Sequence, residues 1–384
     1  MDKRQLHSRL VSVDWDFAGR PSESPFSSIH WHPARFASQI PATLIGLLTR
    51  PGEVVLDPFL GSGTTLVESQ RLARSSIGID VNPVACLLAE AKTVPTRATA
   101  ISGLVTTILG DANELLQGDL LAGSPAETCP STVQASKWYT PEVRRDLARL
   151  WHQIASYGPR KKLLAQAAFS ALLLPVCKET RHWGYVCDNS TPRSRHGGDV
   201  LGTFGRVLSG LSNAYKRRDA ELRARQGPDF DVVAAQVVRG DCRKLLADMP
   251  SGSIDCVITS PPYFGVVDYV KAQRLSMEWF QHEIEPIRLE EIGARSKRHR
   301  RTALQEYMDE LRETFAAIRR VVRAGGYVAL VFGESRSRDS VLDDVRSGLR
   351  AAGFEIELDL NRRVSSQRRQ APSVRGEHLL VLRR

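Results

Sequence analysis

One short stretch near the amino terminus restricts the fold more than any other part of the chain. Residues 53–57 (EVVLD) form an apolar run that predicts a buried strand, and the run opens at Pro58 into a glycine-rich turn. Residues 64–74 then have helical character, and residues 76–80 (SIGID) predict a second strand. A strand, a glycine-rich turn, a helix and a strand in this order form a βαβ unit, which predicts a parallel, doubly wound α/β sheet.

The same α/β pattern returns in the carboxyl-terminal part of the 384-residue chain. Its last two predicted strands are close enough in sequence to pair antiparallel. We therefore expect a Rossmann-like sheet of seven strands that is mostly parallel, with a last strand that runs antiparallel. The five strands predicted in this part are residues 236–240, 254–260, 327–332, 354–360 and 378–382.

A mainly helical stretch separates the two parts of the sheet. Residues 110–136 look rich in loops, whereas residues 141–156, 161–178 and 201–225 favour amphipathic or buried helices. The chain is expected to divide into an amino-terminal segment, two halves of one α/β domain and an insertion between them. The predicted segments are residues 1–29, the first half 30–97, the insertion 98–231 and the second half 232–384.

Composition limits the class of protein. The longest apolar stretches fall short of the roughly 20 residues of a membrane helix, so no membrane partner is expected. The amino terminus lacks the apolar region of a secretory signal, which predicts a cytoplasmic protein. The six cysteines contain no Cys-x-x-Cys pair, so we expect reduced thiols and no metal site. Lys and Arg number 53 against 43 Asp and Glu, and this net charge of +10 favours a polyanionic partner.

Two motifs that follow predicted strands carry the chemistry. They are Asp57-Pro-Phe-Leu-Gly-Ser-Gly-Thr-Thr65 and Thr259-Ser-Pro-Pro-Tyr263. Together they resemble the S-adenosylmethionine-dependent amino-methyltransferases of DNA, which methylate the exocyclic amine of cytosine or adenine. The resemblance covers roughly residues 28–97 and 236–384 and implies the class I methyltransferase fold with S-adenosyl-L-methionine as cofactor.

The glycine-rich turn suits a cofactor that crosses the end of a strand. Gly61 and Gly63 allow the backbone to turn tightly and approach a ligand closely, and Asp57 can anchor the turn. Leu66 stands where a dinucleotide fingerprint has its third glycine, and no Gly-Lys-Ser/Thr follows, which disfavours a nicotinamide-linked oxidoreductase and a phosphate loop. A plain tight turn is the alternative.

Asp80 ends the second predicted strand, where a carboxylate can accept hydrogen bonds from the two ribose hydroxyls of adenosine. The alternative is that Asp80 caps the helix that begins at Asn82-Pro83. Asp241 resembles the family's adenine-contacting acid, with an ordinary turn aspartate or Asp111 as alternatives.

Other cofactor residues follow from the resemblance alone. The segment His32-Pro-Ala-Arg-Phe36 resembles the part of the family that packs over the methionine end of the cofactor, and an ordinary loop covering the sheet is the alternative. The predicted cofactor-binding residues are Arg35, Phe36, Asp57, Pro58, Phe59, Gly61, Gly63, Thr64, Asp80, Asn82 and Asp241.

Ser260, Pro261, Pro262 and Tyr263 are the predicted catalytic residues. An exocyclic amine is a poor nucleophile because its lone pair is delocalised into the ring, so acceptors must hold its hydrogens. Proline lacks an N–H and fixes φ, which leaves rigid carbonyls that no local donor uses. The Ser260 side chain and the Ser260 or Pro261 carbonyl would accept from the amine, while Tyr263 would stack on a base flipped out of the duplex. A strand that simply ends at Pro-Pro is the alternative.

The catalytic motif also indicates the target atom. Methylation at carbon 5 of cytosine needs a cysteine after proline, and the sequence has no Pro-Cys pair, which favours direct transfer to nitrogen. In the family, serine at the first position of the motif favours N4 of cytosine, and Asp or Asn favours N6 of adenine. Ser260 therefore implies N4-cytosine, with N6-adenine as the alternative. An RNA amine methyltransferase and a noncatalytic nucleic-acid-binding module are rivals from other classes.

Duplex DNA is the implied partner, with a cognate restriction endonuclease left open and a nucleoid-associated location in the cytoplasm. Basic runs near the catalytic motif fit phosphate contacts, although such runs are often solvated faces. The insertion is a candidate target recognition region, including its basic helix 216–225, and a structural cap is the alternative. The predicted DNA-binding residues are Arg193, Arg195, Arg295, Lys297, Arg298, Arg300, Arg301, Arg362, Arg363, Arg368 and Arg369.

Overall fold

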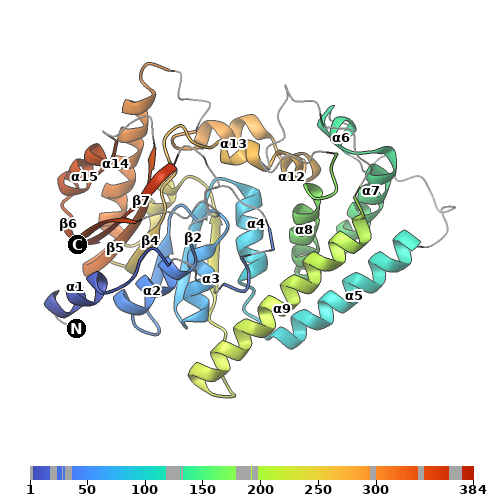
Figure 1. Cartoon of the computed structure of the whole chain (residues 1–384), viewed down its shortest axis with the longest axis horizontal. Coiled ribbons are helices and arrows are strands. Elements are labelled where there is room, and N and C mark those ends of the chain that lie inside the picture. The colour runs from blue at the N-terminus through green and yellow to red at the C-terminus, as the bar shows by residue number, and fades with distance from the viewer. Residues whose placement is uncertain are drawn as a thin grey trace.

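A seven-stranded sheet of order β3-β2-β1-β4-β5-β7-β6 forms the centre of the computed structural model (Figure 1). The structure describes residues 3–17, 24–27, 29–30, 37–117, 130, 133–178, 192, 198–294, 300–335, 341–362 and 374–384. The strands are β1 (Val54–Asp57), β2 (Ser75–Asp80), β3 (Ala235–Arg239), β4 (Ile254–Thr259), β5 (Val322–Ser335), β6 (Glu355–Arg362) and β7 (Val374–Arg383).

Parallel pairing joins five of these strands. β1 pairs with β2 on one side and β4 on the other, β2 pairs with β3, and β4 pairs with β5. Only β7 runs against its neighbours, between β5 and β6. The predicted Rossmann-like fold is confirmed. The chain adds β2 and β3 on one side of β1 and then crosses to place β4 on the other side. Because the strand order reverses between β1 and β4, a crevice for ligands is expected at the carboxyl ends of these strands.

Helices cover both faces of the sheet because alternate residues of each strand point to opposite sides. Leu56 and Val257 face a core formed with α10, α14 and α15, whereas Val55 and Ile258 face a core formed with α1 and α2. The helices of the α/β part are α1 (Lys3–Val11), α2 (Gln39–Leu48), α3 (Thr64–Arg71), α4 (Pro83–Lys92), α10 (Cys242–Asp248), α14 (Ala303–Val321) and α15 (Val341–Ala351).

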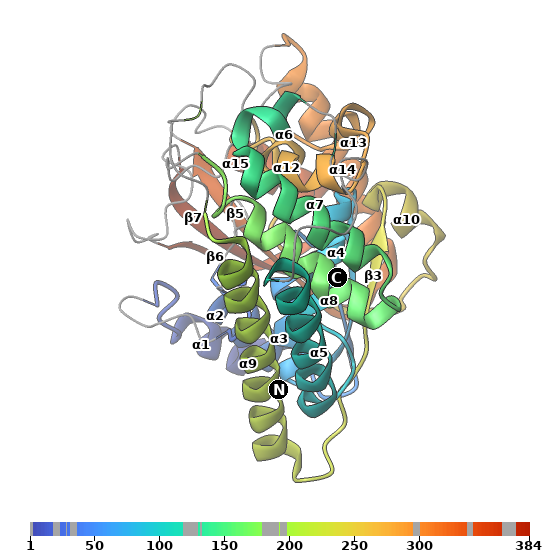
Figure 2. The ribbon, with the colours of Figure 1, turned by 90° about the vertical axis from the view of Figure 1, so that its right-hand side faces the viewer.

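The insertion forms a helical layer beside the sheet (Figure 2). Its helices are α5 (Ala98–Gln117), α6 (Val133–Trp138), α7 (Pro141–Ala155), α8 (Pro159–Leu173) and α9 (Val200–Gln226). The three helices predicted here are confirmed as α7, α8 and α9. The loop-rich prediction for 110–136 is wrong for residues 110–117, because buried Ile108 and Ala112 continue an apolar face of α5 in the core shared with α9.

Three short helices lead from β4 back toward the insertion: α11 (Tyr269–Ala272), α12 (Arg274–Trp279) and α13 (Ile284–Glu290). Trp279 on α12 packs edge-on against Phe169 on α8, with ring centroids 5.2 Å apart. Ser276 and Ser170 are also hydrogen-bonded, with 2.7 Å between their hydroxyl oxygens. The segment that follows the catalytic motif is thereby attached to the insertion.

Three further findings apply to the described residues. No helix among them is long and apolar enough to cross a membrane. Cys86, Cys177, Cys242 and Cys256 are buried free thiols, and the other two cysteines lie outside the described ranges. Within those ranges no group of three or more His, Cys, Asp or Glu side chains is arranged to hold a metal ion.

Candidate active site

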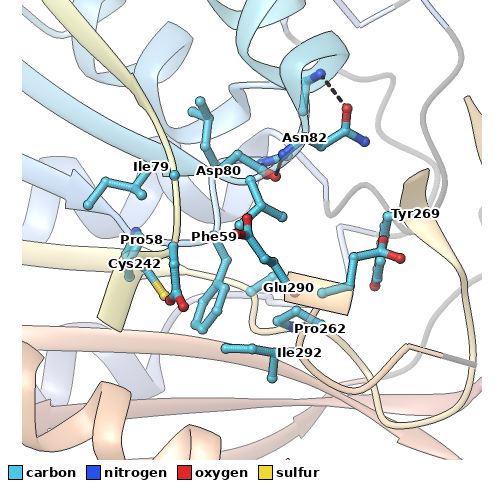
Figure 3. A pocket seen from close by; sticks show the side chains of 18 of the residues that line it. Pro58, Phe59, Ile79, Asp80, Asn82, Cys242, Pro262, Tyr269, Glu290 and Ile292 are labelled. Atoms are coloured by element: carbon cyan, nitrogen blue, oxygen red, sulfur yellow. Dashed lines mark hydrogen bonds between the residues drawn. The ribbon is translucent and has the colours of Figure 1, made fainter. Parts of the chain in front are cut away.

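A pocket opens at the carboxyl ends of β1, β2, β3 and β4 (Figure 3). The space between its walls is about 890 Å³, with the open solvent at its mouth included. The glycine-rich turn, the end of β2 and the Ser-Pro-Pro motif all contribute to its wall, although they are far apart in the sequence. The lining residues include Pro58, Phe59, Gly61, Thr64, Asp80, Asn82, Asp241, Ser260, Pro262, Tyr269, Glu290, Glu291 and Ile292.

The turn after β1 has the backbone geometry that its glycines predict. Gly61 and Gly63 have φ angles of +51° and +81°, in the left-handed region where a side chain is strained. Gly63 also lies directly against Ala89 on α4. The turn can therefore pass close to both α4 and a ligand in the pocket.

We expect Gly63→Ala to lower the free energy of unfolding by about 2–3 kcal/mol. A Cβ at this position would lie 2.8 Å from the Ala89 Cβ, and the residue would keep a positive φ. Gly46→Ala is the matched control, because Gly46 is exposed on α2 with nothing within 4 Å, and the exchange should stabilise the helix by up to about 1 kcal/mol. Denaturant unfolding of both variants measures the difference, and a Gly63→Ala variant as stable as the wild type would contradict the packing argument.

Asp80 holds the turn from the end of β2. Its Oδ2 accepts from the Gly61 N–H at 2.8 Å, and its Oδ1 accepts from the Asn82 N–H at 2.9 Å. The cap of α4 is Asn82 itself, whose side chain accepts from Val84 and Ala85, so the alternative role of Asp80 as that cap does not apply. Burial raises the pKa of Asp80 to about 6. Each carboxylate oxygen retains acceptor capacity toward the pocket.

Asp57 lies behind the pocket wall and joins the two motifs. Its Oδ1 accepts from the Thr259 hydroxyl at 2.5 Å and from the Phe59 N–H at 3.2 Å. Burial raises the pKa of Asp57 to about 6. Because Thr259 directly precedes Ser260, Asp57 fixes the catalytic segment relative to the glycine-rich turn.

Asp241 lines the pocket at the start of α10, near the end of β3. Its carboxylate accepts from the Arg243 N–H at 2.9 Å and pairs with the Arg243 guanidinium, at 2.7 Å between Oδ2 and Nη2. The rival Asp111 pairs with Lys161 inside the insertion and is not part of the pocket wall. The geometry therefore favours Asp241 over Asp111.

Ser260 and Pro262 reach the pocket directly after β4. The Tyr307 hydroxyl donates to the Pro262 carbonyl at 2.8 Å, which fixes the turn. Within the described part of the chain, no donor is paired with the carbonyls of Ser260 and Pro261. These two carbonyls and the Ser260 hydroxyl are thus the acceptors that the motif offers.

Tyr263 is buried beside the pocket and not in its wall, so the stacking role expected from the sequence stays a prediction. Its side chain is 4% exposed and is not part of the pocket wall. The ring packs against Phe332, with centroids 5.9 Å apart, and over Gly333 on β5. A Cβ on Gly333 would lie 2.2 Å from the Tyr263 ring, so the glycine creates the space that the ring fills. The aromatic residues of the pocket wall are Phe59 and Tyr269.

Sequence reasoning missed Tyr269 and the segment from Glu290 to Ile292. Figure 3 shows Tyr269, Glu290 and Ile292 around the pocket together with Pro262. Glu291 accepts from the Val270 N–H at 2.9 Å, and burial raises the pKa of its carboxyl to about 8. No motif marked these positions. Their place depends on how the loop after Ser-Pro-Pro-Tyr returns over the strand ends.

Arg362 corrects another prediction. It is 3% exposed, it pairs with Glu377 on β7, and it donates to the Trp15 carbonyl at 2.8 Å. A buried, fully engaged guanidinium cannot hold a DNA phosphate. Arg300 and Arg301 are exposed just before α14, as phosphate contacts require. Ten predicted site residues lie outside the described ranges, namely Arg35, Phe36, Arg193, Arg195, Arg295, Lys297, Arg298, Arg363, Arg368 and Arg369.

The basic end of α9 is only partly available to a partner. Arg218 is buried and donates to the Gln70 side chain and the Val94 carbonyl, both at 3.0 Å, so it attaches the insertion to the α/β part. Figure 1 shows this end of α9 below the sheet. Arg218 is therefore not available for base readout, and readout by the rest of the 216–225 segment stays a prediction.

Similarity to known proteins agrees with the chemistry of the pocket. Residues 5–91 match the DNA methylase family of N6 and N4 methyltransferases. The type II methyltransferase M.MjaII of Methanocaldococcus jannaschii is 21% identical over 85% of this chain and 76% of its own length. M.BsoBI of Geobacillus stearothermophilus is 23% identical over 62% of this chain, which spans about half (49%) of that relative. The solved rRNA methyltransferase AviRa of Streptomyces viridochromogenes has a TM-score of 0.38 at 12% identity, covering 95% of this chain and 93% of its own.

The resemblance to DNA amino-methyltransferases thus agrees with the similarity of residues 5–91 to the N6/N4 DNA methylase family and of most of the chain to a type II methyltransferase. Both target amines, N4 of cytosine and N6 of adenine, are compatible with these similarities.

Proposed function

We propose that this relative of the N6/N4 DNA methylases transfers a methyl group from S-adenosyl-L-methionine to the N4 amine of cytosine in a specific duplex DNA sequence. The observation that carries the proposal is the shared pocket. It brings the glycine-rich turn and Asp80 to one side of a space whose other side contains Ser260 and Pro262. A nucleoside cofactor and a base amine can thus meet in one place.

The residues present fit S-adenosylmethionine. Asp80 would accept from the ribose hydroxyls, because its oxygens face the pocket with acceptor capacity left after their bonds to Gly61 and Asn82. The left-handed backbone of Gly61, which lines the pocket, would leave room for the chain of the cofactor, and Asp241, which lines the pocket near the end of β3, would accept from the adenine amine. When bound, the cofactor supplies a methyl group on a sulfonium, which is a strong electrophile.

The chain's own part in the reaction is to prepare the amine. The Ser260 hydroxyl and the Ser260 or Pro261 carbonyl would accept hydrogen bonds from the two amine hydrogens, which draws the nitrogen lone pair out of conjugation with the ring. With the amine held in this way, its nitrogen would attack the methyl carbon that the cofactor supplies, and the carbon–sulfur bond would break with its electron pair on sulfur. The cationic nitrogen would then lose one proton to water at the open mouth of the pocket, and the product is the neutral N-methylated base. The base must first leave the duplex stack to reach this pocket.

The test is to incubate the purified chain with labelled S-adenosylmethionine and unmethylated genomic DNA, and to identify the methylated nucleoside by mass spectrometry. N4-methylcytosine is the expected product. N6-methyladenine would keep the reaction but overturn the base assignment from Ser260. No methylated deoxynucleoside, with the cofactor bound, would overturn the proposed function, and labelled RNA in its place would identify an RNA methyltransferase.

The basic run 295–301 is proposed to hold DNA phosphates, with Arg300 and Arg301 exposed at the start of α14. We expect Arg298→Ala combined with Arg300→Ala to weaken binding to all duplex sequences alike, by about tenfold at physiological salt, and to reduce the salt dependence. The control is Arg4→Ala, on exposed α1 at the lower left of Figure 1, away from the start of α14. Fluorescence anisotropy with several duplexes at several salt concentrations measures this. A loss confined to one recognition sequence would show that these arginines read bases instead.

The insertion 98–231 is proposed as the target recognition region, because it lies between the cofactor and catalytic motifs in the chain and packs through α8 on the segment after Ser-Pro-Pro-Tyr. The basic end of α9 is not part of this proposal. Since the curated relatives are named type II methyltransferases, a cognate restriction endonuclease is included as a proposed biological partner, with no contact between the two proteins implied.

A further inference from the structure

The role that we infer for Tyr263 depends on residues of three neighbouring strands, β5, β7 and β6. Gly333 on β5, Glu377 on β7 and Arg362 on β6 are cross-strand partners and form one row across these strands. Directly paired residues of neighbouring strands point to the same face of a sheet. The Tyr263 ring fills the space over Gly333, and this brings its hydroxyl next to the Glu377 carboxylate.

A directed chain of hydrogen bonds results. The Ser260 hydroxyl donates to the Tyr263 hydroxyl oxygen at 3.3 Å, and the Tyr263 hydroxyl donates to Glu377 Oε1 at 3.4 Å. The Arg362 guanidinium binds the other carboxylate oxygen of Glu377 and also donates to the Trp15 carbonyl. Burial raises the pKa of Tyr263 well above its usual value, so the phenol keeps its proton. The donors of Ser260, Tyr263 and Arg362 are therefore all directed toward Glu377.

The direction of these hydrogen bonds determines what the Ser260 hydroxyl can offer to a ligand in the pocket. A hydroxyl has one hydrogen and two lone pairs. Since the Ser260 hydrogen is directed to Tyr263, the lone pairs of Ser260 Oγ are left for the pocket, which Ser260 lines. An exocyclic amine brings only hydrogens to this atom. A Ser260 hydroxyl turned the other way would bring its own hydrogen toward them.

We propose that Tyr263, Glu377 and Arg362 are positioning residues that hold the Ser260 hydroxyl as an acceptor for the target amine. This inference rests on the proposed function and deepens it. It gives the fourth residue of Ser-Pro-Pro-Tyr a role that does not require contact with the base. It also gives the buried Arg362, which the sequence placed among the phosphate contacts, a place in the reaction.

The decisive variant is Glu377→Gln, because it should reverse the donor-to-acceptor direction of these hydrogen bonds with little change in the shape of the side chain. Arg362 offers only donors, so the amide oxygen would face Arg362 and the amide NH₂ would face Tyr263. The Tyr263 hydroxyl would then donate to Ser260, and the Ser260 hydrogen would point into the pocket. We expect the single-turnover rate of methyl transfer to fall about tenfold or more, with the Kd of S-adenosylmethionine unchanged.

Tyr263→Phe is the second variant, because it keeps the ring over Gly333 and removes only the hydroxyl. It should lower the rate to a similar extent. The double variant should be no slower than Tyr263→Phe alone, since one break already interrupts the chain. Asp359→Asn is the matched control on β6, because Asp359 pairs with Arg346 at 2.7 Å and has no contact with Tyr263 or Glu377 among the bonds of the described residues. Its rate should stay at the wild-type value.

Each outcome decides one question. If the wild type transfers the methyl group and Glu377→Gln does so at a rate within twofold of it, the positioning role is overturned and the proposed function is left intact. Independent effects that multiply in the double variant would also overturn it. If Glu377→Gln fails to fold, an unchanged rate for Tyr263→Phe overturns the role and a reduced rate supports it. A wild-type chain that binds cofactor but transfers no methyl group would overturn the proposed function and this inference with it.

Discussion

Ser260→Ala is expected to lower the rate of methyl transfer about 100-fold while the Kd of S-adenosylmethionine stays within twofold of the wild-type value. The physical reason is that the Ser260 hydroxyl lines the pocket and supplies an acceptor to the amine as its lone pair leaves the ring. Groups placed to meet charge that develops in a transition state are typically worth 10²–10³ in rate. Single-turnover transfer from labelled cofactor to duplex DNA measures the effect.

The control for this variant is Ser253→Ala. Ser253 precedes the same strand at its other end, is exposed, and donates to the Pro250 carbonyl at 2.8 Å. Its loss should leave the transfer rate unchanged. Wild-type turnover by Ser260→Ala would show that the main-chain carbonyls of Ser260 and Pro261 alone prepare the amine, and it would remove the basis for assigning the base from this serine.

Asp80→Ala is expected to weaken S-adenosylmethionine binding by about 100-fold or more. Two hydroxyl donors to one buried carboxylate are lost, and hydrogen bonds to charged groups contribute about 1.5–3 kcal/mol each. The Gly61 N–H also loses its acceptor, which loosens the turn. Isothermal titration calorimetry measures the Kd. Asp248→Asn, an exposed carboxylate at the end of α10, is the control, and unchanged binding by Asp80→Ala would place the ribose elsewhere.

The same carboxylate predicts a pH dependence of cofactor binding. Burial raises the pKa of Asp80 to about 6, so the group is ionised at pH 7 and becomes protonated as the pH falls through 6. The ionised form is the better acceptor for ribose hydroxyls. The affinity of the wild type should therefore fall by up to about tenfold per pH unit below 6, and the residual binding of Asp80→Ala should lack this component. Parallel titrations between pH 5 and 8 compare the two.

The fold followed from local patterns because a buried strand, a glycine-rich turn and a helix are each marked by residues close in sequence. The apolar run at 53–57 became β1, and the left-handed angles of Gly61 and Gly63 agree with the turn expected there. Helix α5 was misjudged between residues 110 and 117. Its continuation depends on contacts with α9, which are far away in the sequence.

The pocket was predictable where a motif ends a strand, since parallel strands bring their carboxyl ends to one edge. Asp80 and Ser260 line the pocket for this reason. Tyr269 and Glu291 were not predictable, because they enter the wall through a loop whose path depends on the packing of α12 on the insertion.

The order of the elements, the two motifs and the chemistry of the acceptors could be derived from the amino-acid sequence, because these depend on residue type and short spacing. The positions of the Tyr263 and Arg362 side chains, by contrast, depend on contacts between residues that are far apart in the sequence. A tyrosine after Pro-Pro can face a base or a sheet, and the small Gly333 on a strand distant in sequence makes space for it against the sheet. An arginine in a basic run can face solvent or the core, and Glu377 opposite it on β7 provides the buried partner that keeps it inside.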